Sequence, residues 1–317
     1  ALMFVCEPSV DSDGMRDILR ALASLATGHS DSDGRKFQLT FACPGRNHDS
    51  ITLNMLTEYC RRGLGEVEYL IPWDYSSEAS MREELEQGLR RFNSYGWMKA
   101  ANSEIRFAVV REGSGSEGGE ADFQWQASVL SDLGCYADMS YPGVRRSRPQ
   151  SMVNTMFMVS PADKEQYNES DELRAGRLGK GGLLVIKGPF LIDWTDWRLT
   201  LRPYVEDGHL SPEAPPDPGR VDSWVRANVH VIGQPNWIFV KLMIDGLSDA
   251  ASARSLRHSL DRSLMYLEEV CNDGERYRLR YVTAREMYNV AMAAQALKSG
   301  NAGLFRDYLV EPYEATQ

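Results

Sequence analysis

Residues that hold transition metals or form disulfide bridges are scarce in this chain. It has 5 histidines and 5 cysteines among 317 residues. The cysteine number is odd, and no two cysteines have the CxxC spacing of zinc sites and redox motifs. We therefore expect neither a disulfide framework nor a cysteine-based zinc site. Free thiols favour a reducing compartment, so the sequence predicts a cytoplasmic protein.

Long apolar runs and excess positive charge are also lacking. No run reaches the ~20 residues that a membrane-spanning helix needs, and no secretory signal peptide is visible. The net charge is −10, whereas nucleic-acid-binding proteins are usually basic, at least locally. The short cluster of Arg145, Arg146 and Arg148 is typical of a solvated face. We expect neither a membrane nor a nucleic acid as partner.

Apolar runs and helical patterns do alternate along the chain, which predicts an α/β protein with a parallel sheet. We see no internal repeat and no low-complexity boundary, so residues 1–317 are interpreted as one domain, a closed or nearly closed (β/α) barrel. The expected strands are 2–6, 37–43, 67–71, 105–110, 136–139, 183–186, 237–244 and 277–282. The expected helices are 15–26, 49–62, 77–95, 121–133, 221–229, 251–271 and 283–299, with Asp11 or Ser12 capping the first and Gly63 ending the second.

Acidic residues follow many of the expected strands, where a barrel carries its chemistry. Carboxylates there can bind a hard cation or act as acid and base, but acids are also common in solvated loops and first helical turns. Asp74 and Asp245 stand out because each directly follows an apolar strand. His48 is the one histidine in these loops. The acids are Glu7, Asp11, Asp13, Asp49, Asp74, Glu112, Asp138, Asp193, Asp245 and Glu286.

Other residues of the same loops suggest ligand contacts. Lys187 follows a strand and would place a cation in the pocket. Trp73 and Trp194 would either stack against a sugar or fill the barrel mouth, and the sequence favours neither. His29, His209 and His258 are interpreted as surface residues. No GxSxG elbow is present.

Four segments resemble bacterial polysaccharide deacetylase-like proteins of the NodB type: 134–138, 183–189, 234–242 and 281–289. The resemblance covers roughly residues 66 to 299, and its last segment is the most specific. It implies a deformed (β/α) barrel and a metal-dependent hydrolase of amide or ester bonds, in which zinc or a similar ion activates water.

Histidines that the family pattern places after three strands are missing here. The corresponding segments, 69–74, 109–113 and 243–246, contain none, and the first keeps only Asp74. Met, Ile, Pro and Trp cannot replace imidazole as a zinc ligand. We therefore favour a protein without the ancestral metal site. The alternative is a rearranged site for zinc or another divalent metal, built from Asp11, Asp13 and His48 with Asp74.

The sequence thus leads to three hypotheses. The first is a deacetylase-like protein that binds a saccharide, another small ligand or a partner, or runs a metal-independent reaction. The second is an active metal-dependent deacetylase, and the third is a structural subunit of an oligomer. If Arg111 and Asp245 face one pocket, they should pair. The candidate catalytic residues are Asp13, Asp74, Asp245 and Arg111, and the candidate ligand-binding residues are Trp73, Glu112, Asp138, Lys187 and Trp194.

Overall fold

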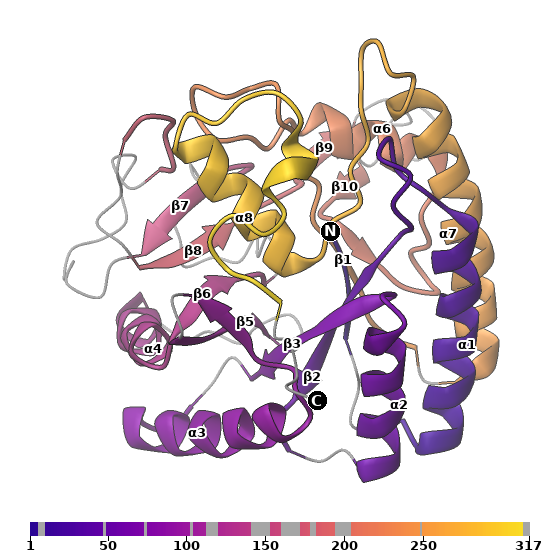
Figure 1. The fold of residues 1–317 in the computed structure, drawn as a ribbon. Coiled ribbons are helices and arrows are strands. Elements are labelled where there is room, and N and C mark those ends of the chain that lie inside the picture. Colours follow the sequence, from indigo (N-terminus) through magenta and orange to yellow (C-terminus); the bar gives the residue numbers. More distant parts are fainter. Residues whose placement is uncertain are drawn as a thin grey trace.

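Strands of a mostly parallel sheet alternate with helices along the chain, which makes it an α/β protein (Figure 1). The computed structural model describes residues 1–5, 10–46, 49–72, 75–101, 104–111, 120–140, 153–159, 172–177, 182–193, 204–247 and 249–312.

The main sheet combines strands from both ends of the chain. Its members are β1 (Leu2–Val5), β2 (Leu39–Pro44), β3 (Gly65–Ile71), β4 (Lys99–Ala101), β5 (Glu104–Arg111), β6 (Cys135–Asp138), β7 (Met156–Val159), β8 (Leu183–Ile186), β11 (His209–Leu210) and β12 (Leu242–Ile244). They follow the order β11-β12-β1-β2-β3-β5-β6-β8-β7, with β4 on β5. Neighbours from β11 to β8 are parallel, whereas β7 and β4 are antiparallel to their partners. Strands β9 (Leu191–Asp193) and β10 (Tyr204–Glu206) form a separate antiparallel pair.

The helices begin at residues whose side chains accept hydrogen bonds from the first turn. Asp11 caps α1, Asp49 caps α2, and Thr283 forms a capping box with Glu286 at the start of α8. Gly63, with φ of 70°, follows α2 as expected. The helices are α1 (Ser12–Gly28), α2 (Ser50–Arg61), α3 (Glu78–Ser94), α4 (Glu120–Asp132), α6 (Pro218–Arg226), α7 (Ala250–Cys271) and α8 (Ala284–Gln295), and η2 (Ala302–Phe305) is a short 3₁₀ helix.

Both faces of the main sheet are buried, as is usual for parallel strands. On β3, Tyr69 belongs to one core cluster and its neighbour Leu70 to the other. Helices α1, α2, α3 and α7 pack into the first cluster, and α8 packs into the second. In Figure 1 the first group forms an outer rim, while α8 lies near the middle of the molecule. The sheet is therefore covered by several helices on one face and by α8 on the other.

The sheet is curled, as a buried lysine shows. Lys241 directly precedes β12, and its Nζ donates to the carbonyl oxygens of Ser140, after β6, and of Ile186, at 2.5 Å, in β8. In the sheet order, β1, β2, β3 and β5 stand between β12 and β6. A flat sheet would hold these strands far apart, since neighbouring strands are about 4.8 Å apart.

Two expected strands differ in the structure. Only the end of 237–244 forms a strand, β12, and 277–282 forms none. In the second segment the backbone N–H of Tyr277 donates to Asp273 Oδ1 at 2.9 Å, and that of Tyr281 to Asp31 Oδ2 at 3.1 Å. Because side chains accept these bonds, the alternating apolar pattern does not produce a ladder. Strand β7 lies in a segment for which no strand was expected.

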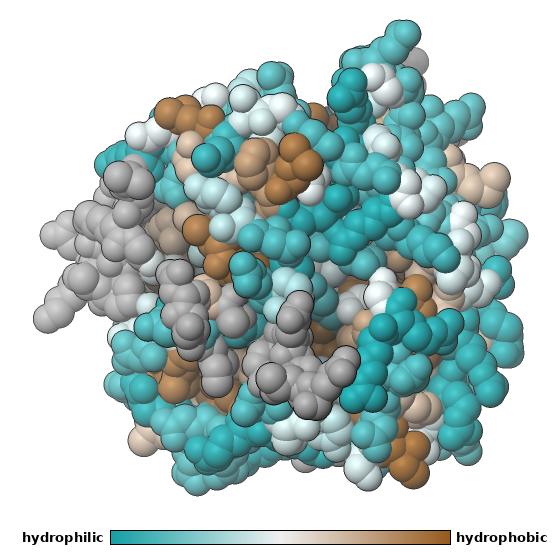
Figure 2. Space-filling view, viewed as in Figure 1, coloured by the Kyte–Doolittle hydropathy of each residue, from teal (hydrophilic) through white to brown (hydrophobic). Residues whose placement is uncertain are grey.

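The surface carries scattered apolar side chains. Leu297, Leu304 and Leu309 are exposed. Figure 2 shows one face of the molecule as mainly hydrophilic, with hydrophobic residues dispersed over it. Among the described helices, none combines the length and the apolar character needed to cross a bilayer.

Candidate functional site

Arg111 and Asp138 meet at the carboxyl ends of β5 and β6. Arg111 Nε donates to Asp138 Oδ2 at 3.0 Å, and Nη1 donates to Gln126 Oε1 of α4 at 2.5 Å. The backbone N–H of Ser140 donates to Asp138 Oδ1 at 3.0 Å, and its hydroxyl bonds to the same oxygen. All four side chains are buried. Strand ends and a helix therefore hold one polar network in place.

The pKa of Asp138 reflects two opposing effects. Burial raises it, because a carboxylate loses hydration, but the Arg111 charge and the Ser140 hydrogen bonds lower it more. The result is a pKa below the usual value. Asp138 is therefore an anion at neutral pH, and it serves as an acceptor rather than as an acid.

Lys241 extends this network from the other side of the curled sheet. It is buried, and burial lowers the pKa of its amine to about 7, with Lys187 lowering it further and Asp138 opposing. Near neutral pH its amine is therefore a mixture of charged and neutral forms. A group of this kind can donate a hydrogen bond in either form and can accept a proton when neutral.

Lys187 lies beside the network, directly after β8. It is half-buried, and its Nζ is 5.6 Å from the centre of the Phe157 ring. The carbonyl of the preceding residue, Ile186, accepts the hydrogen bond from Lys241. The structure thus brings three predicted site residues, Arg111, Asp138 and Lys187, to one edge of the sheet.

Asp245 lies elsewhere on that edge, paired with a histidine. Its Oδ1 bonds to Nε2 of His209. The hydrogen bond to Asp245 raises the pKa of His209, because it favours the charged imidazolium. Both side chains are partly exposed. Arg111 pairs with Asp138, so each member of the expected Arg111–Asp245 pair has a different partner.

The aspartates of the alternative metal site have local roles in α1. Asp11 Oδ1 accepts the backbone N–H of Gly14 at 2.8 Å as the N-cap. Asp13 is exposed and pairs with Arg16 at 2.5 Å. Within the described residues, no group of three or more His, Cys, Asp or Glu side chains is placed to hold a metal ion. His48 and Asp74, which this alternative requires, lie outside the described residues, as do Trp73, Glu112 and Trp194.

Glu286, expected at a strand end, has a structural role instead. Its Oε2 accepts the backbone N–H of Thr283 at 3.0 Å, and its Oε1 is 2.6 Å from Arg35 Nη1. Arg285 binds Glu66 of β3, with Nη2 2.9 Å from Oε1. The most specific segment of the family resemblance therefore fastens α8 to the sheet.

Sequence reasoning missed Gln126, Ser140 and Lys241 and wrongly placed one histidine, His29, on the surface. Lys241 interrupts an apolar run, and such an isolated cation is a signal for a buried polar contact. His29 is buried between Asp261, at 3.1 Å, and Glu268, at 3.2 Å, rather than on the surface. His209 is partly exposed, and its pairing with Asp245 was not predicted. No local sequence pattern identifies the acidic partners of these histidines, because the partners come from distant parts of the chain.

Neither a scan against protein-family models nor a search of curated proteins found a match to this chain.

Proposed function

We propose that this chain is a polysaccharide deacetylase-like protein of the NodB type that binds a saccharide-like ligand without the family's metal site. The observation that carries the proposal is the buried polar network of Arg111, Gln126, Asp138, Ser140 and Lys241. Ligands of parallel α/β sheets bind outside the carboxyl ends of the strands, which is where Arg111 and Asp138 lie.

The curl of the sheet supports a deformed barrel. Lys241 reaches across from β12 to the ends of β6 and β8. Such a contact brings the two halves of the strand order together, as barrel closure requires. The resemblance implies the same architecture.

The energetic cost of the network supports a functional role. Burying a charged pair is often no more stabilising than apolar packing of the same volume, because both ions lose hydration. A site built from fixed donors and acceptors suits the hydroxyl groups of a sugar, which also need paired hydrogen bonds when they are desolvated. Lys187, half-buried next to the network, is the residue we expect to touch the ligand.

Binding of oligosaccharides tests the proposal. Neutral, acidic and N-acetylated oligosaccharides would be titrated into the protein by calorimetry. We expect at least one class to bind, and Lys187→Ala to weaken it about tenfold, the loss of one charge-assisted hydrogen bond. Lys36→Ala is the matched control, because Lys36 is exposed and precedes β2 at the opposite edge. Absence of binding by every class would contradict the proposal.

The His209–Asp245 pair supports a second candidate, a metal-independent acid–base reaction. A histidine with a raised pKa stays protonated to higher pH and can act as a general acid. Hydrolysis of 4-nitrophenyl acetate in the presence of EDTA would then fall as pH rises through that pKa. Asp245→Asn should move the fall to lower pH, and His209→Gln should abolish the activity. His258→Gln, at an exposed histidine, should leave it unchanged.

A further inference from the structure

A cavity of about 470 Å³ lies between α6, α7 and α8, at the opposite edge of the sheet from the polar network. Gln38, which precedes β2, and Leu242, which begins β12, mark its position at the amino ends of these strands. The volume is within the ~300–1,000 Å³ range of small-molecule sites. Because the cavity lies at the amino ends of the strands, it is separate from the proposed saccharide site at their carboxyl ends.

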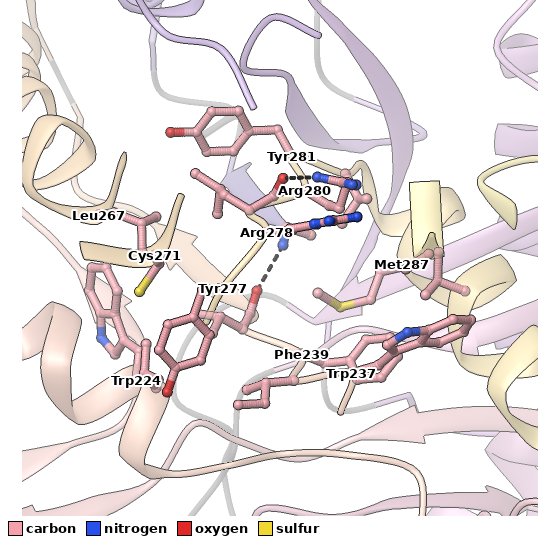
Figure 3. Close-up of a pocket in the computed structure, with 18 of the residues that line it drawn as sticks. Trp224, Trp237, Phe239, Leu267, Cys271, Tyr277, Arg278, Arg280, Tyr281 and Met287 are labelled. Atoms are coloured by element: carbon pink, nitrogen blue, oxygen red, sulfur yellow. Dashed lines mark hydrogen bonds between the residues drawn. The ribbon is translucent and has the colours of Figure 1, made fainter. Parts of the chain in front are cut away.

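The walls of the cavity are mainly apolar. Figure 3 shows Trp224, Leu267 and Cys271 on one side, with Trp237 and Met287 facing them from the other. These side chains come from α6, α7, the segment before β12, and α8. The two hydrophobic clusters meet here, since Trp224 belongs to one and Met287 to the other. An apolar body would replace water in this space favourably.

Two polar atoms in the wall lack partners. Ser263 Oγ and Trp224 Nε1 are buried, and neither has a hydrogen-bond partner in the described part of the chain. Both residues line the cavity. An unpaired buried donor costs about 1–3 kcal/mol, so native structures rarely keep one without a use. Both atoms are fully covered by neighbouring groups, so they lie behind the surface of the cavity rather than on it.

One segment of the cavity wall is rich in arginine. Arg276, Arg278 and Arg280 alternate in sequence, and all three line it, together with one acid, Glu275. Arg280 is neutralised by Asp33, with Nε 3.0 Å from Oδ2. Arg276 and Arg278 are exposed, and Arg278 Nε makes only a 3.4 Å bond to the carbonyl of Gly274. The rim therefore keeps positive charge for an anion.

We propose that this cavity binds an amphipathic carboxylic acid, with its apolar body between α6, α7 and α8 and its carboxylate at Arg276 and Arg278. The apolar walls select the body and exclude small hydrophilic anions. The arginine rim selects the acid over a neutral analogue, because guanidinium groups bind carboxylates with charge-assisted hydrogen bonds.

Binding of decanoate, followed by calorimetry, tests this proposal with 1-decanol as the neutral analogue. We expect saturable 1:1 binding of decanoate, at least tenfold tighter than that of 1-decanol. Arg278→Ala should weaken decanoate about tenfold and leave 1-decanol unchanged. Arg262→Ala, an exposed arginine of α7 outside the cavity lining, is the matched control and should change neither. Absence of saturable decanoate binding, or equal affinity for 1-decanol, would overturn the proposal.

Leu264→Trp provides an independent check of where decanoate binds, because the larger side chain would fill the cavity. It should abolish binding while circular dichroism stays native. Leu264 is in the core, so a second variant, Leu267→Phe at a half-buried wall position, covers the case in which Leu264→Trp fails to fold. Full-strength decanoate binding by a folded variant with a filled cavity would also overturn the proposal.

Discussion

At the scale of single residues, buried charge is what distinguishes this chain. Arg111 and Asp138 are both buried and bonded to each other. The burial of either charge would therefore be costly if the other were removed. Lys241 is buried with carbonyl acceptors, and burial shifts the equilibrium of its amine toward the neutral form. The free energy of unfolding should therefore depend on keeping both members of the Arg111–Asp138 pair, and it should vary with pH because of Lys241.

Removing one member of the Arg111–Asp138 pair should be strongly destabilising. Arg111→Met leaves a buried carboxylate without its counter-charge, and we expect a loss of about 3–5 kcal/mol in the free energy of unfolding. The double variant Arg111→Met with Asp138→Leu should lose clearly less than the sum of the two single variants. Urea denaturation measures both. Additive losses would show that the two side chains are not energetically coupled.

Lys241 should make the protein more stable as pH rises. Its pKa is about 7 in the folded protein, lowered from 10.5 by burial, so between pH 7 and 10 the unfolded chain binds more protons than the folded one. The free energy of unfolding then increases with pH in this window, by up to about 1 kcal/mol per pH unit from this group. Urea denaturation at several pH values would show the slope, and Lys241→Met should remove it. An unchanged slope in that variant would assign it to other groups.

At the scale of elements, α8 is fixed at its first turn. Thr283 Oγ1 accepts the N–H of Glu286 at 3.3 Å and bonds to Glu66 Oε2 at 3.1 Å. Thr283→Ala should therefore cost about 1–2 kcal/mol in the free energy of unfolding, from the lost cap and the lost contact with β3. Thr283→Ser keeps the hydroxyl and is the control. A Thr283→Ala variant as stable as Thr283→Ser would show that the cap contributes nothing measurable.

Asp273 should protect backbone amide hydrogens from exchange in the turn that leads to Arg276, Arg278 and Arg280. Its Oδ1 accepts the backbone N–H groups of Glu275, Arg276 and Tyr277 at 2.9–3.0 Å. Asp273→Ala leaves these groups to water, so their amide hydrogens should exchange faster in hydrogen-exchange mass spectrometry. Asp273→Asn keeps an acceptor and should change the rates less. Equal exchange in all three proteins would mean that this turn does not depend on Asp273.

Sequence patterns predicted most elements because those patterns are local. The helix over 15–26 is confirmed in α1, with Asp11, one of the two expected caps, as its N-cap, and the run at 183–186 is confirmed as β8. The prediction of a strand over 277–282 was wrong. Backbone N–H groups of this segment donate to side chains instead, and one of these acceptors, Asp31, is distant in sequence. The site was predicted in part for the same reason: strand ends identified Arg111 and Asp138, but only the curl of the sheet brings Lys241 to them.

At the scale of the whole molecule, the two hydrophobic clusters share one set of strands. On β5, Val109 faces one cluster and Val110 the other. Loss of either cluster would expose the same sheet, so the chain should unfold as one unit. We expect coincident thermal transitions by circular dichroism and tryptophan fluorescence, with equal calorimetric and van't Hoff enthalpies. Two separated transitions would contradict the interpretation of 1–317 as one domain.

The position of α8 has a consequence for synthesis on the ribosome. Most of the strands in its hydrophobic cluster come from the first half of the chain, yet α8 (Ala284–Gln295) is translated almost last. Until α8 emerges, one hydrophobic face of the sheet in the nascent chain is exposed, and such a state is prone to aggregation. Productive folding must then wait for the final stretch of translation, and a chaperone that shields apolar surface would raise the yield.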